Sequence, residues 1–320
     1  MKQTLAIITL ASSALLTACG GGGGSTSTNQ GDTTPEDVQA FNYLNAERSR
    51  CGFGTLTRKT TLDAAASAHA DWMHHAGVLS HDEDQSMFPV GFTGNTAYDR
   101  ALAQDAYNLR DGFDVYEALA VQSGLGKAGE GVYSLRRLLN APYHAIGLLD
   151  GYRDIGVAVR HSSDVGLSGN VTYTAYVPGA SRSVGKQVLA SDAVLTYPCE
   201  GSAGMANKLS NETPNPVPGR DLSTNPLGVT VLVKVADGQA LAITSASMVE
   251  LATGNAVPLR AHVGGANGLA DPINDYNASN VFISADVAMT PFSQYKAVIT
   301  GTNNGVAFRR EFVFSTGTSL

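Results

Sequence analysis

The chain is poor in cysteine, in charged residues and in long apolar runs. Each of these features limits the class of protein and the kinds of partner that we expect. Of its 320 residues, 3 are cysteine and 15% are charged. The net charge is −7, and no segment gathers lysine and arginine. Phosphate binding needs such clusters of positive charge, so we expect no nucleic acid among the partners of this protein.

The one long apolar run lies at the N-terminus. Residues 5–16 are apolar or small throughout and follow the positive charge of Lys2. The run is shorter than the roughly 20 residues that a helix needs to cross a bilayer, so it predicts the apolar part of a secretory signal peptide. The remaining chain, with 43% hydrophobic residues overall and no second run of this kind, has the composition of a globular body.

The predicted signal ends in Leu-Thr-Ala-Cys at Cys19, which resembles the lipobox of bacterial lipoproteins. In those proteins the cysteine is acylated and becomes the new N-terminus. Glycines and then polar residues follow, so 19–34 predicts a flexible tether. We expect residues 1–18 to be removed and the mature protein to work outside the cytoplasm, held on a membrane by lipid. Gly20, where some lipoproteins have aspartate, favours the outer membrane; the alternative is an ordinary cleaved signal.

The cysteine count also predicts a cross-link. If Cys19 carries lipid, Cys51 and Cys199 remain as a pair. The periplasm and the cell surface are oxidising, and there we expect a disulfide between these two residues. Two unpaired buried thiols are the alternative.

The character of the sequence changes twice after the tether. Residues 35–180 mix helical and strand patterns, whereas 181–225 is polar and rich in proline, which predicts a linker or a wrapping segment. Residues 226–320 alternate apolar and polar side chains between turns, and their last strands resemble those of bacterial Ig-like domains. The predicted helices cover 35–50, 61–76, 96–106 and 132–139, and the predicted strands of the first part cover 113–120, 154–160 and 171–177.

Four segments of 35–180 carry a family resemblance through their order and spacing. They are Leu-Asn-Ala-Glu-Arg at 44–48, the alanine-rich helix with His-Ala-Asp-Trp-Met at 69–73, Leu-Ser-His at 79–81, and Ala-Pro-Tyr-His at 141–144 with Asp-Ile-Gly-Val at 154–157. Together they resemble the CAP superfamily of cysteine-rich secretory, antigen 5 and pathogenesis-related proteins, whose shared unit is the SCP domain. The resemblance implies a three-layer α/β/α sandwich for 35–180. With the all-β Ig-like sandwich predicted for 226–320, the chain is expected to be α+β.

The resemblance also implies a cavity lined by two histidines and one or two glutamates, which in some members holds a divalent ion. The histidines fall on His81 and His144. Glu117 is the preferred first glutamate, because a loop and a helix fit between it and His144; Glu130 is the other candidate. Imidazole and carboxylate ligands suit zinc, so His81, His144 and Glu117 are the candidate ligands of Zn²⁺ or another divalent cation. Buried histidines bonded to backbone are the alternative.

The function implied by the resemblance is non-enzymatic binding or interaction in the cell envelope. A lipid, a molecule derived from peptidoglycan or a protein is the expected ligand. One alternative is a metal-assisted, peptidase-like hydrolase, in which Glu117 near His81 and His144 acts on a bound water. Another is a structural or adhesive envelope protein that acts through its C-terminal domain.

Overall fold

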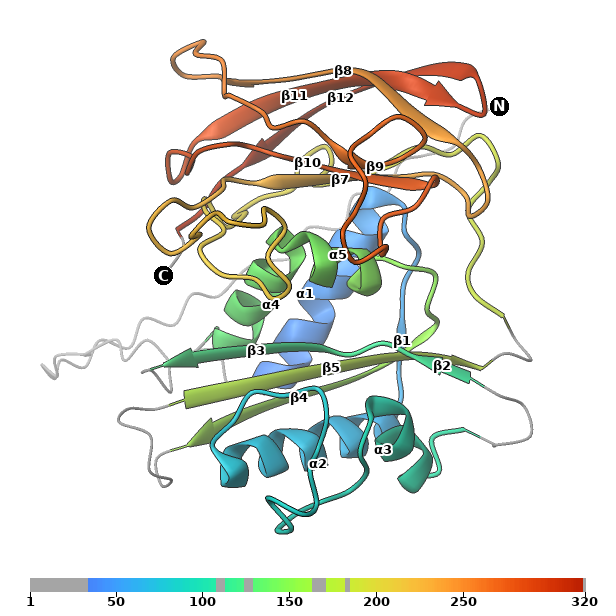
Figure 1. Cartoon of the computed structure of the whole chain (residues 1–320), viewed down its shortest axis with the longest axis vertical. Helices are drawn as coiled ribbons and strands as arrows, with labels where there is room; N and C mark the ends of the chain where they lie inside the picture. The colour runs from blue at the N-terminus through green and yellow to red at the C-terminus, as the bar shows by residue number, and fades with distance from the viewer. Residues whose placement is uncertain (1–33, 108–112, 124–128, 163–170, 182–184, 319–320) are drawn as a thin grey trace, which may run out of the picture. The chain divides into compact units, whose positions relative to one another are not determined.

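The computed structural model describes residues 34–107, 113–123, 129–162, 171–181 and 185–318 (Figure 1). Cys19, the predicted signal and the predicted tether lie outside these residues. Thr34–Leu320 forms one compact unit. Helices alternate with mostly antiparallel strands, which confirms the predicted α+β class. Within the described ranges, no helix is both long and apolar enough to cross a membrane.

The first part of the unit has three layers around one sheet. The sheet order is β1-β4-β5-β2, and β3 also pairs with β5. Helices α1, α4 and α5 cover one face, and α2 and α3 cover the other (Figure 1). The helices are α1 (Glu36–Cys51), α2 (Thr60–Ala76), α3 (Ala97–Ala103), α4 (Glu130–Asn140) and α5 (Pro142–Leu148). The strands are β1 (Thr57–Arg58), β2 (Phe113–Val115), β3 (Ala118–Ser123), β4 (Asp154–Ser162) and β5 (Val171–Ser181).

Local sequence explains how the longer helices begin and end. In α1, two acidic residues occupy the first turn, where they interact favourably with the positive end of the helix dipole. Gly52 ends α1 and Gly77 ends α2, with φ of +85° and +67°. Glycine adopts these left-handed conformations without steric cost.

Helix α2 lies unusually close to strand β4. A Cβ atom added at Gly156 would lie 2.1 Å from the backbone carbon of Leu62. Asp63, the next residue of α2, accepts a hydrogen bond from the backbone N–H of Val157 at 2.9 Å. The glycine therefore allows the backbone of α2 to contact the backbone of β4, and this contact holds α2 against the sheet.

Two local features differ from the sequence-based expectation. The strand predicted over 113–120 is divided into β2 and β3 by Tyr116 and Glu117, because Glu117 turns toward a buried arginine described below. Pro142, which lies just after the helix predicted over 132–139, begins a further helix, α5. Proline fits the first position of a helix because the N–H there has no partner within the helix.

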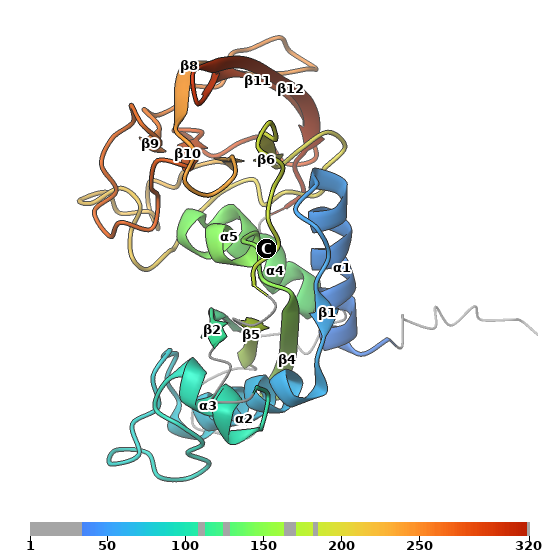
Figure 2. The same cartoon turned by 90° about the vertical axis from the view of Figure 1, so that its right-hand side faces the viewer.

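The C-terminal part consists of two antiparallel sheets stacked face to face (Figure 2). One has the order β6-β7-β10-β9 and the other β12-β11-β8. Their strands are β6 (Leu195–Tyr197), β7 (Thr230–Lys234), β8 (Leu241–Glu250), β9 (Val263–Gly264), β10 (Asn280–Ser284), β11 (Gln294–Asn303) and β12 (Val306–Ser315). Strand β6 comes from the segment predicted as a linker, and Tyr197, Met205 and Leu209 of that segment are buried.

One hydrophobic core continues from the helices into these sheets. Tyr143 of α5 packs edge-on against Tyr276 and Phe282, with ring centroids 6.1 and 6.2 Å apart. Cys51, at the end of α1, is bonded to Cys199, just beyond β6, with Cα atoms 5.5 Å apart. This confirms the predicted disulfide. Apolar contacts and a covalent bond therefore join the two parts.

We predict that the disulfide contributes strongly to stability. It links residues 148 positions apart, and closing a loop of that length lowers the entropy of the unfolded chain. The double variant Cys51→Ser/Cys199→Ser should therefore lose about 5 kcal/mol of unfolding free energy at most. Urea denaturation measures the loss, with the double variant in dithiothreitol as the control. An unchanged urea midpoint for reduced wild-type protein would contradict this expectation.

Candidate functional site

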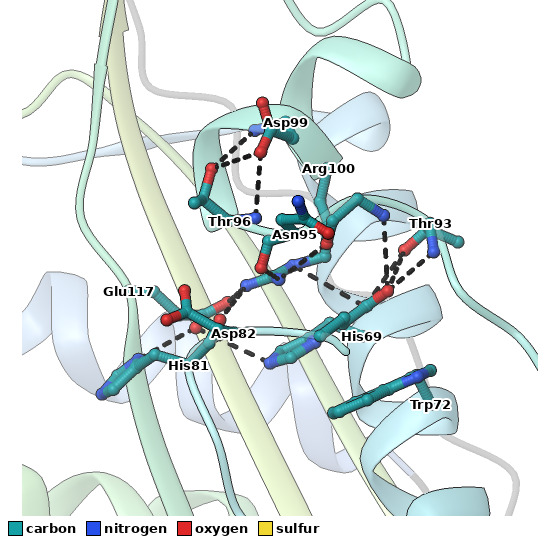
Figure 3. Close-up of polar contacts among 12 residues, drawn as sticks. His69, Trp72, His81, Asp82, Thr93, Asn95, Thr96, Asp99, Arg100 and Glu117 are labelled. Atoms are coloured by element: carbon teal, nitrogen blue, oxygen red, sulfur yellow. Dashed lines mark hydrogen bonds and ion pairs between the residues drawn. The ribbon is translucent and has the colours of Figure 1, made fainter. Parts of the chain in front are cut away.

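Glu117 is a carboxylate buried between two strands and held by two partners. Its side chain is 3% exposed. Oε1 accepts a hydrogen bond from Nη2 of Arg100 on α3 at 2.8 Å, and Oε2 lies 3.0 Å from Nδ1 of His81 (Figure 3). Arg100 is itself 1% exposed and also donates to the carbonyl oxygen of His81 at 2.8 Å. The ion pair therefore holds the backbone of His81 as well as its ring.

A second buried pair lies beside the first. Nδ1 of His69 on α2 lies 2.9 Å from Oε1 of Glu83, and Nε2 lies 2.9 Å from the carbonyl oxygen of Ser80. Both ring nitrogens of His69 therefore have a polar partner, one a carboxylate oxygen and the other a carbonyl oxygen. The other oxygen of Glu83 accepts from the backbone N–H of Thr93 at 2.6 Å. These contacts fix both ends of the loop that carries His81.

Charge balance keeps both glutamates ionised. Burial by itself raises the pKa of each carboxyl. For Glu117, the hydrogen bond from His81 and the charges of His69 and Arg100 outweigh burial and lower the pKa below its usual value. For Glu83, the hydrogen bonds from His69 and Thr93, with the charge of Arg100, have the same net effect. These four buried side chains contact one another, and we call them the charge cluster (His69, Glu83, Arg100 and Glu117).

His81 and His144 line the same cavity, of about 370 Å³. Its walls are β3, α4, the start of α5 and the segment 208–213. The His81 side chain is 56% exposed, and Glu117 lies behind it rather than in the cavity wall. The structure therefore brings the two predicted histidines to one cavity and places Glu117 in contact with the first of them.

His144 has a carboxylate neighbour that sequence reasoning missed. Its Nδ1 lies 3.4 Å from Oε1 of Glu212, which also accepts the backbone N–H of Tyr143 at 2.7 Å. Burial raises the pKa of Glu212 despite these contacts. Glu212 belongs to the predicted linker, and no motif around it signals a functional residue.

Glu130, the other predicted glutamate, lies away from these residues. It occupies the first turn of α4, and its Oε2 is 2.9 Å from Nδ1 of His161 on β4. The cavity lining does not include it. Glu130 therefore takes part in a contact between α4 and the sheet.

The predicted ligand set does not fit a zinc site. In each cavity histidine, Nδ1 faces a carboxylate, which leaves only Nε2 for a metal. Within the described parts of the chain, no three histidine, cysteine, aspartate or glutamate side chains are grouped to hold a metal ion. Zinc sites in proteins use three or four such ligands. We therefore assign no step of the function to a metal.

Comparison with known proteins identifies the first part of the chain. The family model of CAP, the cysteine-rich secretory protein family, matches residues 41–176. An outer surface protein from Borrelia burgdorferi is 19% identical, with a TM-score of 0.35, over 47% of this chain and 96% of that one. An extracellular protein containing an SCP domain from Bacillus anthracis strain Ames is 22% identical, with a TM-score of 0.31, over 45% of this chain and 40% of that one.

The family model alone supports the assignment, because both TM-scores are low. No curated protein sequence matches the chain. Residues 41–176 therefore match the CAP family model, whose shared unit is the SCP domain. The C-terminal sheets lie beyond the matched residues.

We predict that Arg100→Met destabilises the protein far more than Arg160→Met. Arg100 is buried, and its loss leaves Glu117 without its cation, which costs about 3–5 kcal/mol for a buried pair. Arg160 and Asp71 form an ion pair at 2.8 Å with side chains 38% and 53% exposed, so its loss costs less than about 1 kcal/mol. Chemical denaturation of both variants measures the difference. Equal losses would argue against the charge cluster.

We also predict that zinc does not bind stoichiometrically to residues 34–320. Two imidazoles without a third ligand cannot complete the coordination that zinc requires. Calorimetric titration should give the same small heats for wild type and for His144→Ala. A stoichiometric transition that disappears in His81→Ala and in His144→Ala would show that the chain does form a metal site.

Proposed function

We propose that the protein is a non-enzymatic binding protein of the cell envelope. Its cavity beside His81 and His144 would take a small molecule that has an apolar body and an acidic group. The observation that carries this proposal is the cavity itself, in which apolar walls and cationic side chains meet.

The size and walls of the cavity suit a small organic ligand. Its volume of about 370 Å³ falls within the ~300–1,000 Å³ typical of small-molecule sites. Leu119 of β3, Leu138 of α4 and Leu209 of the following segment are buried and line it. An apolar ligand body would gain about 25 cal/mol for each Å² that it buries against such walls.

The charges at the cavity favour an acidic group. Arg137 and the exposed Lys208 line it, together with His81 and His144. The negative charge of Glu117 lies behind His81 and is balanced by Arg100 at 2.8 Å. Glu212 also belongs to the wall, but its side chain is 0% exposed, so its carboxyl is shielded from the cavity, and burial raises its pKa. An anion would therefore meet more positive than negative charge.

The location that we propose is extracytoplasmic, with the protein tethered through lipid on Cys19. The signal-like N-terminus and the lipobox support it. The disulfide between Cys51 and Cys199 supports it independently, because such bonds persist mainly in oxidising compartments. The C-terminal sheets, proposed to be Ig-like, would then act as a spacer or an adhesive part on the outer-membrane surface.

The 3.0 Å contact between His81 and Glu117 keeps hydrolysis as a second candidate function. A carboxylate on Nδ1 leaves Nε2 as a base that could accept a proton from water. Casein or murein hydrolysis that is lost in both His81→Ala and His144→Ala would support this candidate. The binding proposal expects neither substrate to be cleaved.

We predict that residues 34–320 bind octanoate and not octanol or octyltrimethylammonium. A larger side chain at the cavity wall should occupy part of the cavity, so Ser210→Trp should weaken this binding at least about tenfold, or ~1.4 kcal/mol. Val306→Trp, at an exposed residue outside the cavity, is the matched control and should bind like wild type. Isothermal titration calorimetry measures each affinity. Equal binding by Ser210→Trp and wild type would place the ligand elsewhere.

A further inference from the structure

Strand β3 has one backbone edge without a strand partner. Among the described residues, β3 pairs only with β5. The carbonyl of Ile155 on β4 faces β1, because it accepts the N–H of Lys59 at 3.0 Å. Ala158, three residues later, therefore faces β5 and pairs with Ala175, whose other neighbour is Leu119 of β3. Since alternate residues of an antiparallel strand face opposite sides, the N–H and C=O of Leu119 point away from β5.

The same alternation places the main-chain groups of Val121 on this edge. The carbonyl oxygen of Val121 lies 3.5 Å from Nη1 of Arg137 on α4, which is a weak contact at that distance. Within the described parts of the chain, no hydrogen bond satisfies the N–H of Val121 or the N–H and C=O of Leu119. Unpaired groups of this kind on an edge strand are a template for pairing with another chain.

The unpaired edge of β3 borders the cavity. Leu119, Ala120 and Val121 all line it. Side chains of a strand alternate between the two faces of a sheet, so three consecutive residues bring the edge of the strand, rather than one face, against the cavity. The other walls come from both sides of the sheet, because His81 follows α2 and His144 belongs to α5. The cavity therefore runs along the edge of β3.

We infer that the ligand of this cavity is an extended peptide with a free C-terminal carboxylate, which pairs with the edge of β3. This inference rests on the proposed function and names the class of its ligand. When a peptide adds to a sheet edge, main-chain hydrogen bonds give affinity and alternate side chains enter pockets. An extended peptide presents its N–H and C=O to one side at every second residue, about 6.8 Å apart, as Leu119 and Val121 do. A fatty acid has the acidic group but no N–H groups for this edge.

The side chains around the cavity favour a peptide that ends there. Arg137 lines the cavity beside the carbonyl of Val121, and the exposed Lys208 also lines it. A guanidinium group at this position suits a terminal carboxylate, because the two can form a pair of parallel hydrogen bonds. Leu138 and Leu209 of the walls would contact alternate side chains of the peptide.

N-methylation of a probe peptide tests this pairing, because the methyl group removes one N–H and blocks strand addition on that side. The probe is acetyl-Leu-Ala-Leu-Ala with a free carboxylate. It is compared with its C-terminal amide and with two forms N-methylated at the second or at the third residue. Adjacent residues of a strand face opposite sides, so only one of these two N–H groups can face β3. Calorimetry on residues 34–320 measures each affinity.

A proline substitution tests the same edge from the side of the protein. Val121→Pro removes the unpaired N–H and leaves the hydrogen bonds with β5 in place, since proline is tolerated where the N–H of an edge strand faces away from the sheet. Ala307→Pro, at an exposed residue of edge strand β12, is the matched control. Val313 of that strand donates away from β11 to Glu200 at 2.7 Å, and Ala307, six residues earlier, faces the same way. Circular dichroism verifies that both variants are folded.

The inference expects the free acid to bind at least about tenfold more tightly than the amide, and one N-methylated form to bind at least about tenfold more weakly than the other. Val121→Pro should weaken binding of the free acid by a similar factor, whereas Ala307→Pro should bind it like wild type.

Equal binding of the two N-methylated forms to wild-type protein would overturn the inference, and this comparison holds even if Val121→Pro does not fold. A folded Val121→Pro that binds like wild type would overturn it too. If wild type binds octanoate but not the peptide, the inference fails and the proposed function stands. If it binds neither probe, both fail.

Discussion

The buried ion pair between Arg100 and Glu117 is the interaction on which the rest of the site depends. Neither side chain reaches solvent, so each would be costly without the other. Arg100 also holds the carbonyl oxygen of His81, and Glu117 faces its ring. His69 on α2 and Glu83 in the following loop complete the charge cluster. These contacts hold the exposed side chain of His81 at the edge of the cavity.

The opposite side of the cavity is placed by a different kind of contact. Helix α5 begins at Pro142 and packs against Tyr276 and Phe282 of the C-terminal part. Glu212 contacts the start of the same helix, because its carboxyl accepts a hydrogen bond from the backbone N–H of Tyr143. Residues between 79 and 144 and the segment 208–213 therefore line one cavity together.

Much of the fold could be predicted from the sequence, because residues close together in the chain determine where the longer helices begin and end. Capping residues and the 3.6-residue period placed α1 and α2 to within a residue or two, and counting cysteines indicated the disulfide. The pattern did not predict the break between β2 and β3, because the alternation of apolar and polar residues continues across Tyr116 and Glu117. The break coincides with the contact of Glu117 with Arg100, which lies 17 residues earlier in the chain. Pro142 was ambiguous for a similar reason, since proline can follow one helix or begin the next.

The site was predictable only in part. Family motifs indicated His81 and His144, and the structure brings both to one cavity. Sequence spacing favoured Glu117 over Glu130. In the structure Glu117 contacts His81, whereas Glu130 contacts His161. Glu212 could not be found, because its contact with His144 joins residues 68 positions apart through a polar, proline-rich segment.

Hydrogen exchange with and without octanoate tests most directly the claim that both parts of the chain form one binding cavity. The account predicts that saturating octanoate slows exchange together in peptides covering 79–81, 133–144 and 208–213, and leaves β11 and β12 unchanged. Protection confined to the CAP domain, with 208–213 unaffected, would contradict it.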